Sequence, residues 1–226
     1  DPDEYAANAV TRDRSKIRAS YTELARLFEQ EPIQFAVVTA RNDLNASVCN
    51  TALNAGVHIL SEKPVASRPC DITCVIDTAT RAGRKLGVCY INRFQPPVQR
   101  VRQLIKEGIL GRITSCEARL ITSQVKFRNP SLWLFDREKA GGGILSWLGC
   151  HPLDLMRYIT GKNVSKVTAI SANLGDEPIG VEDVVSVSLR FNDGAIGSLQ
   201  AGYQLPISAP GYSGAAYDTY LAFRGT

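Results

Sequence analysis

Two short motifs contain the residue types that proton transfer needs. The first is a Glu-Lys-Pro sequence in which Lys63 directly follows the apolar run 57–60. A lysine at that point lies at the rim of a buried strand, where partial desolvation moves an ammonium pKa toward neutrality. Pro64 restricts the preceding backbone to an extended form and so fixes the direction of Lys63. The alternative interpretation of Lys63 is a surface ion pair.

The second motif is the stretch 141–154, which holds three consecutive glycines, His151 and Asp154. His151 and Asp154 are three residues apart, so on a helix they share a face. A carboxylate beside an imidazole can orient the ring or bind sugar hydroxyls, and the glycines allow a tight turn or a close approach to a ligand. The alternative is a structural histidine satisfied by a buried acid. The other histidine, His58, lies inside an apolar run and is interpreted as structural.

These motifs need elements to position them. The apolar runs 35–38, 57–60 and 86–90 are short enough for buried strands. The segment 69–83 has helical apolar spacing, with Pro69 in its first turn and a glycine at its end. Strands that alternate with helices predict right-handed βαβ units and a parallel sheet, here a doubly wound, Rossmann-like domain.

Helix ends in this half are predicted from capping residues. Ser20 and Glu23 have the spacing of a capping box, and Asn42 or Asp43 is expected to cap a helix that ends at Gly56. A helix cap is also the simplest interpretation of Asn42 and Asp43.

Parallel sheets bind ligands at the carboxyl ends of their strands. Three such ends carry polar groups, at residues 39–42, 61–64 and 90–93. Any one of them is weak evidence, because strand-to-helix turns are polar in any case.

The pattern changes after Asn92, so we expect one domain at 1–92 and a second, of the α+β class, at 93–226. Its expected strands form an open antiparallel sheet, with a hairpin turn at 192–194. A kink or break is expected at Pro152. The expected helices are 97–107 and 145–159, the long loop is 122–143, and the strands are 113–121, 166–174, 183–191 and 195–203.

Composition excludes several classes of protein. The 226 residues are 44% hydrophobic and 21% charged, with a net charge of +4, which excludes disorder, collagen and coiled coil. No apolar run approaches the ~18 residues of a membrane span, and no basic stripe favours nucleic acid. The six cysteines form no CxxC pair, so no metal site is expected. Reduced, mostly buried thiols fit a cytoplasmic protein.

The motifs together resemble the Gfo/Idh/MocA oxidoreductases across nearly the whole chain. The residues that carry the resemblance are Asp1-Pro2-Asp3, Thr39 to Asn42, Ala55 to Pro64, Asn92 to Pro96, Glu107 to Gly111, and the glycine-rich stretch through His151 and Asp154. The resemblance implies a Rossmann domain that binds NAD or NADP, and a second domain whose open sheet forms homo-oligomer contacts. It also implies hydride transfer at a sugar or polyol hydroxyl.

The resemblance also implies roles for particular residues. Lys63 and His151 match the catalytic positions, with Lys63 also touching the cofactor. The matching cofactor positions are Asp1, Thr39, Asn42, Glu62 and Asn92. The matching substrate positions are Asp154, Arg128, Trp133 and Asn92.

The sequence departs from the family pattern in three places. The glycine-rich phosphate loop is absent, which implies that the family's first strand, first helix and second strand are missing here. Asp1 would then bond the ribose hydroxyl, which favours NAD. Separately, Arg224-Gly225-Thr226 resembles a family turn that comes well before the usual C-terminal end. Trp147 stands where many members have an aspartate, and Asn45 where many have a histidine.

Two other functions stay open. Trp147 favours a cofactor-binding or oligomerising protein without redox turnover. The resemblance adds a glycoside hydrolase, because some relatives use bound NAD for transient oxidation during glycoside cleavage.

Overall fold

The computed structural model describes residues 3–13, 17–205 and 217–226. The chain divides into two compact units, Asp1–Cys89 and Tyr90–Thr226, called here the first and the second unit. The sequence expectation was 1–92 and 93–226. Each unit is described by itself.

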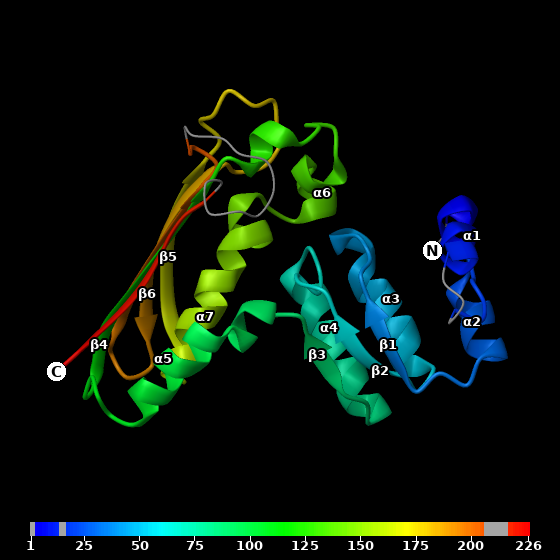
Figure 1. The fold of residues 1–226 in the computed structure, drawn as a ribbon, viewed down its shortest axis with the longest axis horizontal. Coiled ribbons are helices and arrows are strands. Elements are labelled where there is room, and N and C mark those ends of the chain that lie inside the picture. Colours follow the sequence, from blue (N-terminus) through cyan, green and yellow to red (C-terminus); the bar gives the residue numbers. More distant parts are fainter. Residues whose placement is uncertain (1–2, 14–16, 206–216) are drawn as a thin grey trace. The chain divides into compact units, whose positions relative to one another are not determined.

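The first unit is a three-stranded parallel sheet with helices (Figure 1). Its strand order is β1-β2-β3, and Val38 of β1 is in register with Ser61 of β2. The parallel sheet and its order confirm the βαβ prediction. The elements are α1 (Glu4–Asp13), α2 (Leu24–Gln30), β1 (Phe35–Val38), α3 (Asn42–Asn54), β2 (His58–Ser61), α4 (Pro69–Ala82) and β3 (Leu86–Val88).

Helices α3 and α4 pack on one face of this sheet. Leu53 of α3 and Val75 of α4 are fully buried in one core with Ile59 of β2. On the opposite face, Phe35 and Val37 are 55% and 57% exposed. The described residues therefore cover one face of the sheet at β1, where a doubly wound sheet would have both faces covered.

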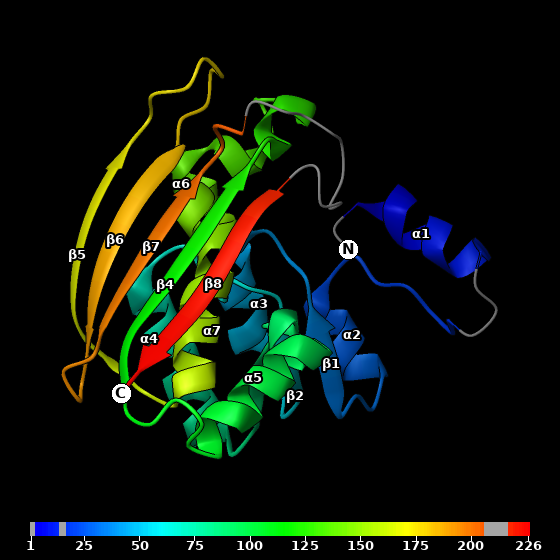
Figure 2. The same ribbon diagram turned by 60° about the vertical axis from the view of Figure 1, so that its left-hand side comes forward.

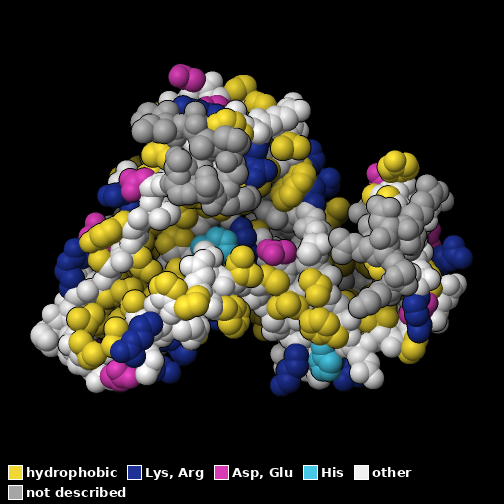
Figure 3. Space-filling model, viewed as in Figure 1, with side chains coloured by type: hydrophobic (Ala, Val, Ile, Leu, Met, Phe, Trp, Pro, Cys, Tyr) yellow, Lys and Arg dark blue, Asp and Glu magenta, His cyan; other side chains and the backbone are white. Residues whose placement is uncertain are grey.

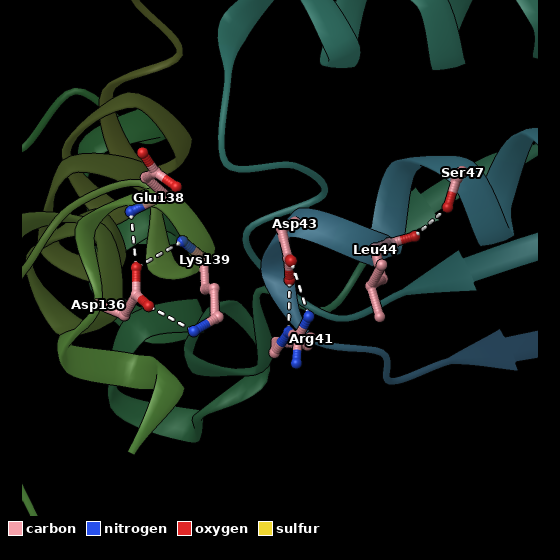
Figure 4. Close-up of polar contacts among 7 residues, drawn as sticks. All are labelled: Arg41, Asp43, Leu44, Ser47, Asp136, Glu138 and Lys139. Atoms are coloured by element: carbon pink, nitrogen blue, oxygen red, sulfur yellow. Dashed lines mark hydrogen bonds and ion pairs between the residues drawn. The ribbon is translucent and has the colours of Figure 1, made fainter. Parts of the chain in front are cut away.

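The expected N-terminal helix caps of this unit are wrong, whereas Gly56 and Gly83 follow α3 and α4 at positive φ, as expected. Helix α2 begins at Leu24 without a side-chain cap, and Ser20 Oγ instead donates to Asn8 Oδ1 at 3.2 Å. Helix α3 follows Arg41, also without a side-chain cap, and Arg41 Nε donates to Asp43 Oδ1 at 2.6 Å (Figure 4). The cap positions of α2 and α3 are thus occupied by Glu23 and Arg41 rather than by the expected residues.

The second unit is a five-stranded sheet with order β5-β6-β7-β4-β8 and helices on one side (Figure 2). The elements are η1 (Ile91–Phe94), α5 (Pro96–Lys106), β4 (Ile113–Thr122), η2 (Gln124–Phe127), η3 (Trp133–Phe135), α6 (Arg137–Ala140), the π-helical turn η4 (Leu145–Gly149), α7 (Cys150–Thr160), β5 (Val164–Ala172), β6 (Val184–Phe191), β7 (Ile196–Gly202) and β8 (Tyr217–Gly225).

The sheet is mixed rather than purely antiparallel. Strands β4 and β7 pair in parallel, whereas the other three pairs are antiparallel. A parallel pair needs a long connection, and the helices together with β5 and β6 supply it. The β6–β7 hairpin at 192–194 is confirmed, with Gly194 at φ +90°. Strand β8 was not predicted.

Two local expectations in this unit need correction. The expected loop 122–143 contains η2, η3 and α6, and α6 is capped by Asp136, which accepts from the amide of Glu138 at 3.0 Å (Figure 4). Pro152 does not break α7, because it lies in the first turn, where a missing amide hydrogen is tolerated. The irregularity lies just before it, in the π-helical turn.

One face of the second sheet forms the core of the unit. Burial alternates along β6 and β7, and Met156 of α7 is fully buried against that face together with Phe191 and Leu199. The opposite face is open, with Ile196 57% exposed.

Surface charge is dispersed. On the face that Figure 3 presents, Lys and Arg side chains are scattered among apolar and acidic ones. Among the described residues, no helix is both long and apolar enough to cross a bilayer.

Candidate active site

The first candidate region is the carboxyl-end edge of the parallel sheet. The amide of Glu62 donates to the carbonyl of Val38 at 2.8 Å, so the pairing of β1 and β2 continues one residue beyond β2. Thr39, which is exposed, directly follows β1, and the buried Asn42 opens α3. The structure therefore brings Thr39, Asn42 and Glu62 to one edge, as expected for strands that end in register.

Residues 61–65, called here the Lys63 corner, begin at the last residue of β2. Lys63 is half-buried, and its amide donates to Glu62 Oε2 at 2.9 Å. The peptide bond between Lys63 and Pro64 is cis. The carboxylate of Glu62 thus lies against the backbone of Lys63.

Asn45 was not predicted as a site residue and stood only as a departure from a family pattern. Asn45 is 1% exposed, and its amide nitrogen is within hydrogen-bond distance of the Lys63 corner. A signal was available: Asn45 is a polar residue on the helix face that also carries Cys49 and Leu53, both fully buried.

The second candidate region surrounds His151 at the start of α7. His151 is half-buried, and the ring of Tyr90 meets it edge-on, with centroids 6.0 Å apart and planes at 89°. Edge-to-face packing of this kind fixes the orientation of both rings. From the sequence, Tyr90 was named only as the first residue of the polar strand end 90–93.

Asp154 lies one turn beyond His151 and forms a two-point ion pair with Arg93. Arg93 Nε donates to Asp154 Oδ2 at 2.7 Å, and Arg93 Nη2 donates to Oδ1. The carboxylate is 6% exposed. The hydrogen bond to Asp154 raises the pKa of Arg93 further above its ordinary value. A substrate hydroxyl that binds Asp154 would therefore share its oxygens with Arg93.

Aromatic rings flank Arg93. Its guanidinium carbon lies 5.4 Å from the ring centre of Tyr90 and 5.0 Å from that of Tyr158, both within cation–π range. Burial, with the nearby Cys150 and Asp154 adding to it, raises the pKa of Tyr90 to about 12. Tyr90 is therefore a neutral phenol across the physiological range.

The glycines at 141–143 allow the chain to approach its own backbone. A Cβ on Gly143 would lie 1.9 Å from the carbonyl oxygen of Glu182. That carbonyl accepts from the amide of Ile144 at 3.1 Å, and Glu182 Oε1 accepts from the amide of Leu145 at 3.3 Å. Glu182 thus holds the π-helical turn that leads into His151.

The expected substrate residues Arg128 and Trp133 lie in the segment between β4 and α6. The guanidinium carbon of Arg128 is 4.6 Å from the ring centre of Trp147, which in turn lies 6.0 Å from the buried ring of Tyr203. Trp133 is half-buried in η3. Trp147 therefore packs against a cation and a phenol.

Asn92 lies in η1 beside Arg93, and its Oδ1 accepts from Gln95 Nε2 at 3.1 Å. The structure thus places Asn92, His151 and Asp154 in one region of the second unit. Asp1, an expected cofactor residue, lies outside the described residues. Within the described part of the chain, no group of three or more His, Cys, Asp or Glu side chains could hold a metal ion.

Comparison with protein families gives the same division of the chain. Residues 1–90 match the model described as "Oxidoreductase family, NAD-binding Rossmann fold", and residues 98–219 match that of the "GFO/IDH/MocA C-terminal domain". The chain belongs to the GFO/IDH/MocA oxidoreductase family. The expected fold class, a Rossmann-like parallel-sheet unit followed by an α+β unit, is confirmed, except that the second sheet is mixed rather than purely antiparallel.

Two curated relatives have names that describe enzymes acting on sugars. A 1,5-anhydro-D-fructose reductase of Ensifer adhaerens is 28% identical over 87% of this chain and 58% of its own length. A levoglucosan dehydrogenase of Pseudarthrobacter phenanthrenivorans is 27% identical over 88% of this chain and 56% of its own length. The chain thus spans less than six tenths of these two relatives.

A solved structure agrees over nearly the whole chain. It is a levoglucosan dehydrogenase in complex with NADH and levoglucosan, with a TM-score of 0.86 and 25% identity, and the match covers 98% of this chain and 59% of that one.

Proposed function

We propose that this protein is an NAD(P)-dependent oxidoreductase that transfers a hydride between nicotinamide and a sugar or polyol hydroxyl. The observation that carries the proposal is the polar edge of the first unit, where Thr39, Asn42, Glu62 and Lys63 follow parallel strands that end in register. The names of the relatives, a reductase and dehydrogenases of sugars, support the same class of reaction.

The residues of this edge fit a dinucleotide. The exposed hydroxyl of Thr39, the amide of Asn42 and the carboxylate of Glu62 can hydrogen-bond to its amide and hydroxyl groups. Bound nicotinamide would supply the hydride acceptor or donor. Asp1 at the ribose favours NAD over NADP, and Asn92 is a further proposed cofactor contact.

Lys63 and His151 have different proposed roles. The Lys63 ammonium stabilises negative charge on the reacting oxygen, and the imidazole of His151 accepts or returns the hydroxyl proton. Tyr90 restricts the orientation of that imidazole through its edge-on packing.

Four residues are proposed to bind the sugar. Asn92 and Asp154 supply polar atoms near His151, while Arg128 and Trp133 supply a cation and an aromatic face. Such a mixture suits a sugar, whose hydroxyls need polar partners and whose C–H surfaces stack on rings.

The open face of the second sheet is the proposed contact between copies of the chain. It contains a hollow of about 490 Å³, lined by residues of β4 to β8 that include Lys166, Arg190 and Ile196. All six cysteines are free, which supports a reducing, cytoplasmic location.

The test is substitution of the two proposed catalytic residues. Lys63→Ala and His151→Ala should each lower turnover with NAD(H) and a panel of sugars and polyols by on the order of 10²–10⁴. Lys85→Ala and His58→Gln are the controls, since these residues lie at the far end of β2, where the Lys85 amide donates to His58 Nδ1 at 2.9 Å. Unchanged turnover in both catalytic variants would overturn the assignment.

Trp147 favours a second candidate function, which the same turnover assay would reveal. It cannot orient an imidazole as a carboxylate does, and it packs on Arg128 instead. NADH binding without any absorbance change across the panel would support a cofactor-binding protein without redox turnover. Release of a chromogenic aglycone without net NADH would support a glycoside hydrolase.

A further inference from the structure

A single buried amide lies beside four oxygen atoms of the Lys63 corner. Asn45 Nδ2 is 2.7 Å from the hydroxyl of Ser61, 3.2 Å from the carbonyl oxygen of Val65, 3.3 Å from that of Pro64 and 3.4 Å from that of Glu62. Its two hydrogens are thus directed at one strong acceptor and shared among three weaker ones.

The surroundings fix which way this amide points. Ser61 Oγ donates its hydrogen to the carbonyl of Glu62 at 2.9 Å, so toward Asn45 it can only accept. Carbonyl oxygens also only accept. The nitrogen of Asn45 must therefore face the corner, and the oxygen must point away from it.

This orientation is unfavourable for the side-chain oxygen of Asn45. Asn45 Oδ1 is buried and has no hydrogen-bond partner among the described residues. Burying an unpaired acceptor is unfavourable. The amide is therefore stabilised at this position by the contacts of its nitrogen alone.

Those contacts lie on both sides of Lys63. The Glu62 carbonyl precedes Lys63, and the Pro64 and Val65 carbonyls follow it. We propose that Asn45 is a positioning residue for Lys63, because its amide fixes the backbone on either side and so sets the direction of the Lys63 ammonium. The link to catalysis rests on the proposed function of Lys63.

The substitution Asn45→Asp tests this most directly. It keeps the shape of the side chain but replaces the donor with a carboxylate that faces four acceptor oxygens. Asn50→Asp is the matched control, since Asn50 is a half-buried amide of the same helix whose nitrogen lies 3.6 Å from Cys74 Sγ, away from the corner.

The first readout does not need activity. Lysines are labelled by reductive ¹³C-methylation, and the Lys63 resonance is assigned by its loss in Lys63→Arg. We expect Asn45→Asp to shift this resonance and Asn50→Asp to leave it in place. The second readout is turnover of unlabelled protein, which should fall on the order of 100-fold in Asn45→Asp, as for a displaced catalytic group, and stay within about twofold in Asn50→Asp.

If Asn45→Asp does not fold, Asn45→Leu is the second variant, since it has similar volume and no donor. A Lys63 resonance that stays at its wild-type position in the folded variant would overturn the positioning role. A shifted resonance in a protein whose wild type has no turnover would support the positioning role and overturn the proposed function.

Discussion

The Lys63 corner and the surroundings of His151 are held by different forces. At the corner, the partners are neutral: one buried amide, one hydroxyl and three backbone carbonyls. Around His151, the partners are a charged pair and two phenol rings.

The difference bears on how each region responds to its surroundings. Hydrogen bonds between neutral buried groups depend little on salt or pH, but they fail when one donor is lost. An ion pair with one partner buried resists salt, yet removing the other partner leaves an uncompensated charge. The two regions should therefore respond to different substitutions.

The largest expected effect is that of Arg93→Leu. It leaves the carboxylate of Asp154, 6% exposed, without its counter-ion, and should lower the unfolding free energy of the second unit by about 3 kcal/mol. Tryptophan fluorescence in urea measures this unit separately, because both tryptophans, Trp133 and Trp147, lie in it.

The double variant Arg93→Leu with Asp154→Leu should recover part of the loss, since no buried charge remains. A single variant as stable as wild type would show that the ion pair does not hold α7 and would remove the contrast with the Lys63 corner.

A smaller effect is expected from Gly143→Ala, which acts on the turn before His151. Its new Cβ would lie 1.9 Å from the Glu182 carbonyl oxygen, so the turn must shift, at a cost of about 2 kcal/mol in the same fluorescence measurement. Gly108→Ala is the control: Gly108 has φ +81° and open space, so only backbone strain of about 1 kcal/mol is expected. Equal losses would show that contact with Glu182 does not constrain the turn.

Periodicity and turn residues were sufficient to predict most elements. The segment 69–83 was predicted as a helix from its apolar spacing, and α4 spans Pro69–Ala82 with Gly83 at φ +63° after it. The positions of β1, β2, β6 and β7 were likewise correct within a few residues. These features depend on neighbours close in sequence.

Features that depend on distant neighbours were not predicted. Pairing of β4 with β7 joins strands that are far apart in the chain, and no local pattern encodes it. The expected N-terminal caps failed because α2 and α3 begin at Leu24 and Asn42, which places Glu23 and Arg41 at the cap positions.

The same limit applies to the site. Lys63 and His151 were predicted as site residues from residue type and local context. Arg93 was missed because its partner is 61 residues away. Asn45 was missed because its nitrogen meets the oxygens of residues 61–65 only when α3 has folded against β2.

The smallest expected effect separates the phenol of Tyr90 from its ring. Tyr90→Phe keeps the ring that packs on His151 and Arg93, so stability at neutral pH should stay close to wild type. The hydroxyl makes the stability depend on pH at high pH, because burial raises its pKa from 10.0 to about 12 in the folded protein. The folded state then holds its proton more tightly than the unfolded state, so stability is complete below pH 10 and is lost as pH rises toward 12. After allowance for partial exposure, this loss is roughly 1 kcal/mol.

Burial also raises the pKa of Tyr203, but that contribution is present in both proteins, so the difference between their pH profiles isolates Tyr90. The unfolding free energy of the second unit, followed by tryptophan fluorescence from pH 9 to 12, should therefore fall less steeply in Tyr90→Phe. Identical slopes would mean that the Tyr90 hydroxyl is solvated, and that the region around His151 is held by the ion pair and ring packing alone.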